Sequence, residues 1–228
     1  MVDLTASTQS DLAELVNASV AKSGEVIAAE FQSAGRGRLD RSFEAPPESA
    51  LLFSFFLKPK RARSDWSFIS FLAAMAMHEV ISKDIADKVS LKWPNDILIG
   101  ERKVAGLLAQ QIGDGVIIGI GINVEMGADE LPVPTATSLA LAGSNNLDRN
   151  LLLSAFLNRF AEIFKEWDSG GDFLEKYRQV CSTLGRQVRV EVLGRDSIEA
   201  EAVAITAQGA LILSDGTEVN VGDVVHLR

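Results

Sequence analysis

Two separate clusters of cationic and amide side chains are the parts of this chain best suited to bind an anionic ligand. The first, residues 32–38, reads Gln-Ser-Ala-Gly-Arg-Gly-Arg. Gly35 and Gly37 allow backbone N–H groups to converge on an oxyanion, and Arg36 and Arg38 add charged planar forks that suit carboxylate or phosphate. A loop of this composition can also be an ordinary solvated turn, so the pattern alone leaves both interpretations open.

The second cluster, residues 92–96, reads Lys-Trp-Pro-Asn-Asp. Its proline separates two short apolar runs, 88–91 and 96–99, and therefore places the polar side chains near strand ends. Asn95 and Asp96 can be plain turn residues, or they can contact a hard cation or a ribose beside phosphates.

Lys103, Gly106 and Asn123 follow near the ends of the next expected strands. Lys103 is either a solvated strand residue or a cation whose stem lies against its apolar neighbours. His78 lies within a helical pattern and is interpreted as a packing residue. The sequence lacks the P-loop pattern, and Asp40 stands where a dinucleotide-binding loop needs its third glycine.

Alternating helices and strands must position these residues. Ser7 and Thr8 precede an amphipathic segment and are interpreted first as helix caps, with a ligand contact as the alternative. Hydrophobic periodicity predicts helices over 65–86, 151–167, 172–183 and 9–23. It predicts strands at 25–31, 51–57, 88–91, 96–99, 103–112 and 116–124, then short strands at 187–193, 198–206, 210–213 and 217–226. We therefore expect a mixed α/β domain over residues 1–183 and a small β-barrel domain over residues 184–228.

Composition excludes several classes of protein. The chain has 228 residues and a formal net charge of -9, which argues against general nucleic-acid binding. The single cysteine rules out an intrachain disulfide and favours a reducing cytoplasm. We expect no signal peptide, no membrane span and no N-terminal DNA-binding module.

Five segments together resemble the biotin protein ligases, in that family's order and spacing over nearly the whole chain. They are Ser7-Thr8, residues 32–38, residues 92–96, Arg102-Lys-Val-Ala-Gly-Leu-Leu108 and Gly119-Ile-Gly-Ile-Asn123. The resemblance implies a mixed sheet related to class II aminoacyl-tRNA synthetases, followed by an SH3-like barrel. It also implies ATP-dependent formation of biotinyl-5'-AMP and transfer of biotin to a lysine of a biotin carboxyl carrier protein.

The resemblance assigns roles to individual residues. Those expected to bind biotin are Ser7, Thr8, Gln32, Arg36, Lys103 and Gly106. Those expected to bind ATP are Arg38, Phe43, Lys92, Asn95, Asp96 and Asn123, with Asn95 and Asp96 also implied as Mg²⁺ ligands. Arg36, Arg38 and Lys103 are the implied catalytic residues.

The sequence departs from the family pattern at three positions. Gln9 stands where asparagine is usual, Asp40 replaces a common glycine, and Phe43 replaces a common tryptophan. The alternatives that the sequence leaves open are a lipoate or octanoate ligase of related fold and a non-catalytic ligand-binding module. It does not decide between a monomer and a weak homodimer.

Overall fold

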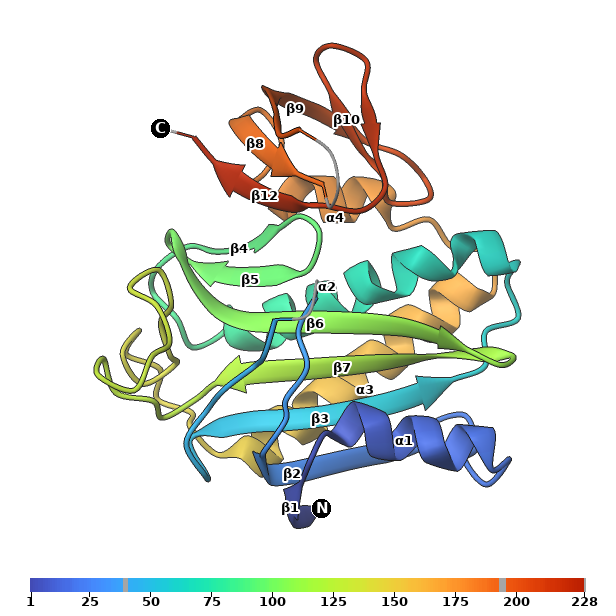
Figure 1. Cartoon of the computed structure of the whole chain (residues 1–228), viewed down its shortest axis with the longest axis vertical. Coiled ribbons are helices and arrows are strands. Elements are labelled where there is room, and N and C mark those ends of the chain that lie inside the picture. The colour runs from blue at the N-terminus through green and yellow to red at the C-terminus, as the bar shows by residue number, and fades with distance from the viewer. Residues whose placement is uncertain (39–40, 193–195, 228) are drawn as a thin grey trace.

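The computed structural model describes residues 1–38, 41–192 and 196–227. It contains a seven-stranded sheet, in the order β1-β2-β3-β7-β6-β5-β4, and a five-stranded antiparallel sheet, in the order β11-β10-β9-β8-β12 (Figure 1). β1 and β2 are parallel and the other pairs of the large sheet are antiparallel. The predicted fold class, a mixed sheet flanked by helices with a small C-terminal β structure, is confirmed.

The described residues form twelve strands, four α-helices and one 3-10 turn. The large sheet comprises β1 (Val2–Thr5), β2 (Val26–Gln32), β3 (Ala50–Leu57), β4 (Val89–Lys92), β5 (Asp96–Ile99), β6 (Arg102–Ile112) and β7 (Gly115–Asn123). The helices are α1 (Thr8–Asn17), a 3-10 turn η1 (Arg63–Phe68), α2 (Ile69–Ile81), α3 (Arg149–Asp168) and α4 (Leu174–Val180). The small sheet comprises β8 (Gln187–Glu191), β9 (Ile198–Ile205), β10 (Leu211–Leu213), β11 (Glu218–Val219) and β12 (Asp223–His226).

The central strand β3 shows how the sequence assigns the two faces of the large sheet. Successive side chains of a strand point to opposite faces. Phe53 and Phe55 pack against Phe156 of α3 on one face, with ring centroids 5.2 and 5.7 Å from the Phe156 centroid. Phe56, on the other face, packs with Leu12 of α1. Helices α2 and α3 therefore cover one face, and α1 covers only part of the other (Figure 1).

Several predicted boundaries were wrong. The helix expected over 9–23 ends at Asn17, because the chain then turns through Ser19, whose φ is 59°, and leaves Val20 exposed. The helix expected over 65–86 is the 3-10 turn followed by the shorter α2. The piece expected over 217–226 is two strands, and β1 was not predicted at all.

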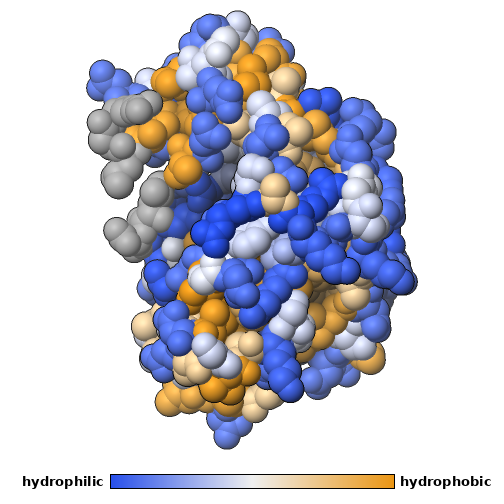
Figure 2. Space-filling model, turned by 90° about the vertical axis from the view of Figure 1, so that its right-hand side faces the viewer, coloured by the Kyte–Doolittle hydropathy of each residue, from blue (hydrophilic) through white to orange (hydrophobic). Residues whose placement is uncertain are grey.

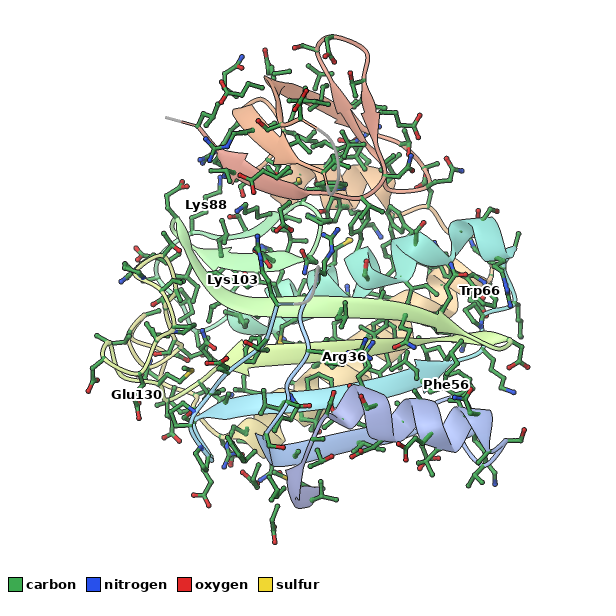
Figure 3. All side chains as sticks on the ribbon, in the orientation of Figure 1. Arg36, Phe56, Trp66, Lys88, Lys103 and Glu130 are labelled. Carbon is green, nitrogen blue, oxygen red and sulfur yellow. The ribbon has the colours of Figure 1, made fainter. Side chains whose placement is uncertain are left out.

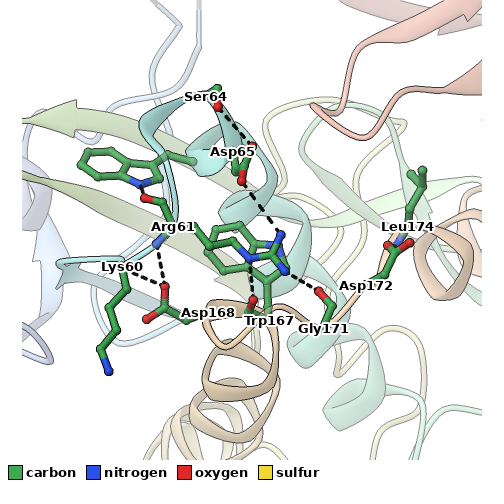
Figure 4. A network of polar contacts seen from close by, with 10 residues as sticks. Lys60, Arg61, Ser64, Asp65, Trp167, Asp168, Gly171, Asp172 and Leu174 are labelled. Carbon is green, nitrogen blue, oxygen red and sulfur yellow. Dashed lines mark hydrogen bonds and ion pairs between the residues drawn. The ribbon is translucent and has the colours of Figure 1, made fainter.

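Arg61 ties the connection after β3 to the end of α3 (Figure 4). Its Nε donates to the Trp167 carbonyl at 2.6 Å, one terminal nitrogen donates to the Gly171 carbonyl at 2.7 Å, and its guanidinium lies 4.6 Å from the Trp167 ring. The Arg61 and Lys60 N–H groups both donate to the Asp168 carboxylate. One side chain thus bonds carbonyl groups at the end of α3 and just beyond it, where the Trp167 carbonyl also accepts the Gly170 N–H at 3.0 Å.

Arg61→Ala is expected to lower the free energy of unfolding by about 2–3 kcal/mol, because it removes two charge-assisted hydrogen bonds and the charged contact to Trp167. Urea denaturation measures this change. Lys60→Ala is the matched control, because the Lys60 side chain points away from the network in Figure 4 and surface substitutions of this kind usually change stability by less than about 0.5 kcal/mol. Equal losses in the two variants would contradict the role of Arg61.

Among the residues that the structure describes, no helix has the length and apolar character that crossing a membrane requires. The side of the molecule seen in Figure 2 is mostly hydrophilic, and its hydrophobic residues form separate patches.

Candidate functional site

A cavity of about 130 Å³ lies on the face of the large sheet that α1 covers only in part. Several of its polar side chains come from the start of α1 and from two strands. The Thr8 hydroxyl donates to Gln32 Oε1 at 3.0 Å and lies 2.8 Å from the Ser54 hydroxyl, while the Thr8 N–H also donates to Gln32 Oε1 at 2.7 Å. Three separate elements therefore meet in one hydrogen-bonded cluster.

Ser7 and Thr8 do not act as the helix caps that local sequence favours. Ser7 occupies the N-cap position, but its side chain makes no capping hydrogen bond, and Thr8 is already the first helical residue. Both are buried, and both line the cavity. The alternative interpretation, in which the two hydroxyls face a polar ligand, is the one that the geometry favours.

Glycines of β7 make room for the cavity and for the residues that close it. Gly119 and Gly121 alternate with core isoleucines, so both lie on the cavity face. A β-carbon at Gly119 would lie 2.3 Å from Gln9 Oε1, and one at Gly121 would lie 2.6 Å from the Phe43 ring. The Gln9 side chain thus occupies the space beside Gly119, and the tip of the Phe43 ring points at Gly121.

Cations and carboxylates also line this cavity. Lys103 Nζ lies 2.6 Å from Asp96 Oδ1, and Arg38 donates to Asn95 Oδ1 at 3.2 Å. Figure 3 shows Arg36 and Lys103 on the same face of the sheet. Lys103 is therefore a paired residue of the cavity wall and not a freely solvated strand residue.

Gly106 gives the Lys103 side chain its space. It pairs with Asp96 across the β5–β6 ladder, and a β-carbon there would lie 3.0 Å from Lys103 Nζ. A side chain at this position would push the ammonium group away from the Asp96 carboxylate.

A second, wider cavity of about 860 Å³ adjoins the first. Phe43, Asp96 and Lys103 line both cavities. Lys92 and Asn123 line only the second, where the buried Asn123 donates from its side chain to the Thr137 carbonyl at 2.9 Å. The sequence-predicted residues thus divide between two connected spaces, with the shared residues at the junction.

The local electrostatics contrast with the negative charge of the whole chain. Burial lowers the pKa of the Arg38 guanidinium, and the nearby Asp223 and Asp96 carboxylates oppose that shift. Burial likewise lowers the pKa of Lys92, again opposed by Asp96. Both groups have high ordinary pKa values, so they are suited to hold an anion away from bulk water.

The sequence did not single out several residues of the site. The sequence does contain a signal for Ser54, which is the only polar residue in the apolar run of β3. The sequence contains no such signal for Arg41 and Asp223. In the structure Arg41 forms a 2.5 Å ion pair with Asp223 of β12, and both residues line the first cavity. Asp40 lies outside the described residues.

Comparisons with known proteins decide the family. Residues 1–126 match the biotin/lipoate A/B protein ligase family, and residues 183–227 match the biotin protein ligase C terminal domain. The biotin–[acetyl-CoA-carboxylase] ligase of Mycobacterium tuberculosis is 34% identical over 100% of this chain and 88% of its own length. The chain belongs to the biotin protein ligase family. As a member of that family, it is an enzyme, a ligase.

Two further proteins are similar to this ligase over most of its length. The biotin protein ligase of Aquifex aeolicus, solved in complex with biotin and ATP, has a TM-score of 0.83 and 30% identity, over 100% of this chain and 97% of that one. The bifunctional ligase/repressor BirA of Escherichia coli is 32% identical over 84% of this chain and 62% of its own length.

Proposed function

We propose that this ligase forms biotinyl-5'-AMP from biotin and ATP and transfers the biotinyl group to a lysine of a biotin carboxyl carrier protein. The observation that carries the proposal is the junction of the two cavities at Lys103, Asp96 and Phe43. One cavity ends in neutral hydrogen-bonding groups that suit a ureido ring. The other is wider and is lined by Lys92, which suits phosphates.

In this proposal the residues act by position and charge. Ser7, Thr8, Gln32 and Gly106 form the biotin pocket, and Arg36 and Lys103 hold the biotin carboxylate. Arg38 and Lys92 hold the phosphates, while Phe43 and Asn123 face the nucleoside. A carboxylate and a triphosphate repel each other, so a positive site lowers the cost of bringing them together.

The reaction has two steps. A carboxylate oxygen of biotin bonds to the α-phosphorus, the bond from that phosphorus to the β-phosphate oxygen breaks, and pyrophosphate leaves. The neutral amine of the acceptor lysine then attacks the acyl carbon, which forms an amide, expels AMP and releases a proton. None of the residues described here is needed as a covalent nucleophile.

Magnesium fits this site as part of MgATP. Among the described residues, no group of three or more His, Cys, Asp or Glu side chains could hold a metal ion. Asp96 offers one carboxylate, now paired with Lys103, and the Asn95 oxygen accepts from Arg38. Mg²⁺ commonly needs only one or two protein carboxylates when it arrives with phosphates, and the proposed ligands, Asn95 and Asp96, match that use.

We also propose two domains, over residues 1–183 and 184–228, and a cytoplasmic location, which the single buried cysteine Cys181 supports. A monomer or weak homodimer is proposed as the oligomeric state. In the described ladders, β5 pairs with β6 only as far as Gly106, so the later part of β6 offers an edge for weak pairing between copies.

The test is to incubate the full chain with biotin, MgATP and a purified carboxyl carrier domain. We expect biotin-dependent pyrophosphate release and a biotinyl mass increment on one lysine of the carrier. Calorimetry with biotin and with lipoate separates the two ligase alternatives, because the cluster of Thr8, Gln32 and Ser54 favours biotin. A lack of pyrophosphate release with biotin would overturn the proposal.

A further inference from the structure

We propose that Thr183 and His226 are positioning residues that hold the turn at residues 92–96 and thereby set the affinity of the enzyme for ATP. This inference rests on the proposed function, because it takes Lys92, Asn95 and Asp96 as the nucleotide side of the site. Thr183 precedes the small sheet and His226 belongs to its last strand. The inference therefore gives the C-terminal region a part in nucleotide binding.

The first step is the contact between Thr183 and the turn. Thr183 is completely buried, and its hydroxyl oxygen accepts the Trp93 N–H at 3.0 Å. The preceding residue, Ser182, donates its N–H to the Leu91 carbonyl at 2.7 Å. The segment before the small sheet thus fixes the end of β4 on both sides of Lys92.

The second step is the direction of the hydrogen bond to His226. The Thr183 hydroxyl lies 3.0 Å from His226 Nε2. Burial, with further contributions from Lys92 and Arg186, lowers the pKa of His226 to about 4. The ring is therefore neutral near pH 7, and its Nε2 can accept the hydroxyl proton while Nδ1 carries the ring hydrogen.

The third step is that the turn has a second anchor on the same side. The Trp93 indole Nε1 donates to the Gly209 carbonyl at 2.9 Å, and the ring is 1% exposed. Gly209 has a φ of 87° and no room for a β-carbon, which would lie 2.4 Å from Phe71. With the indole held in this way, the hydroxyl of Thr183 decides the orientation of the Trp93 peptide, and hence of Lys92 before it.

Loss of the Thr183 hydroxyl should affect the binding of ATP and not the binding of biotin. Lys92 and His226 both line the wider cavity, whereas the Thr8, Gln32 and Ser54 cluster belongs to the other cavity and, within the described part of the chain, makes no hydrogen bond to Thr183. Removing the hydroxyl leaves the buried Trp93 N–H without its acceptor. A misplaced positioning group can then weaken nucleotide binding while the biotin pocket keeps its shape.

The test compares Thr183→Val with Thr183→Ser. We expect Thr183→Val to raise KM for ATP about tenfold in biotin-dependent pyrophosphate exchange and to change KM for biotin by less than twofold. Thr183→Ser keeps the hydroxyl and should return KM for ATP to within twofold of the wild-type value. Calorimetric titration with ATP should show the same order of affinities without requiring turnover.

His226 provides a second pair of variants if Thr183→Val fails to fold. His226→Leu should raise KM for ATP about threefold, and His226→Gln, which retains an acceptor for the hydroxyl, should restore it. His78→Gln is the matched control, because His78 Nε2 contacts the Val89 carbonyl at the other end of β4, at 3.2 Å. It should leave both KM values unchanged.

The outcomes separate this inference from the proposed function. An unchanged KM for ATP in Thr183→Val, an equal rise in both KM values, or a failure of Thr183→Ser to restore ATP binding would overturn the inference. Should Thr183→Val not fold, equal KM values for ATP in His226→Leu and the wild type would overturn it. Wild-type protein that binds ATP but shows no biotin-dependent exchange would overturn the proposed function, and the ATP affinities of the variants would still decide the inference.

Discussion

Arg38→Ala is expected to lower the rate of biotin-dependent pyrophosphate exchange by about 100- to 1,000-fold, the usual cost of removing one charge-stabilising donor from an active site. Arg38 is half-buried, donates to Asn95 and lies near the Asp96 and Asp223 carboxylates. Without its guanidinium, those two carboxylates would face the incoming triphosphate with less compensation. Both the affinity for ATP and the rate of adenylation should fall.

Arg38→Lys separates the charge of this residue from its shape. Lysine retains the positive charge but loses the planar fork that can contact Asn95 and a phosphate together, so we expect an intermediate loss of about tenfold. Arg63→Ala is the control, because Arg63 is exposed and its guanidinium lies over the Trp66 ring, 5.1 Å from the centroid, away from both cavities. It should retain wild-type exchange.

A folded Arg38→Ala protein with exchange within threefold of the wild-type rate would contradict the proposed role. Thermal unfolding provides the check on folding. Arg38 makes one side-chain hydrogen bond among those described, so the substitution should change the unfolding temperature by only a few degrees.

The sequence predicted which segments line the two cavities better than it predicted how those segments meet. Glycines and arginines mark residues 32–38 as a loop, and a proline within a polar segment marks residues 92–96, because both patterns depend on local backbone chemistry. The contact of Thr8 with Gln32 and Ser54 joins three elements, and their register depends on how the sheet assembles. A single sequence does not determine how these three elements align with one another.

The contribution of the small sheet was the least predictable part of the site. Asp223 and His226 read as ordinary residues of a short strand, and only the packing of β12 beside the large sheet brings them to the cavities. The strand β1 was missed for a related reason. Its apolar residues Val2 and Leu4 alternate with polar ones, but the run has only four residues and both apolar side chains are exposed, so pairing with β2 and not the local pattern defines this strand.

Lys103→Ala is expected to weaken biotin binding by about 30- to 100-fold, measured by calorimetry in the absence of ATP. The proposed ligand is a carboxylate, and Lys103 is the cation that compensates the Asp96 carboxylate at 2.6 Å. Truncation therefore removes an attraction and leaves an unpaired negative charge beside the ligand. Losing one partner of a partly buried charge pair commonly costs about 2–5 kcal/mol, and the half-exposed position of Lys103 places the effect near the lower end.

A control for Lys103→Ala comes from a similar ion pair elsewhere. Lys58 Nζ lies 3.0 Å from Asp114 Oδ2 near the β6–β7 hairpin, and neither residue lines the two cavities. Lys58→Ala should leave biotin affinity within twofold of the wild-type value. Unchanged affinity in Lys103→Ala as well would remove Lys103 from the biotin site.

The double variant Lys103→Ala with Asp96→Asn tests why Lys103 matters. If part of its effect is to compensate Asp96, neutralising that carboxylate should recover about tenfold of the lost biotin affinity, because the two substitutions are then not additive. If Lys103 acts only by direct contact with the ligand, the double variant should bind biotin no better than Lys103→Ala.

ATP titrations of the same proteins show whether Asp96 is needed on the nucleotide side. Lower ATP affinity in the double variant than in Lys103→Ala would show that the Asp96 carboxylate affects the binding of both ATP and biotin. We expect this result, because Asp96 lies at the junction of the two cavities.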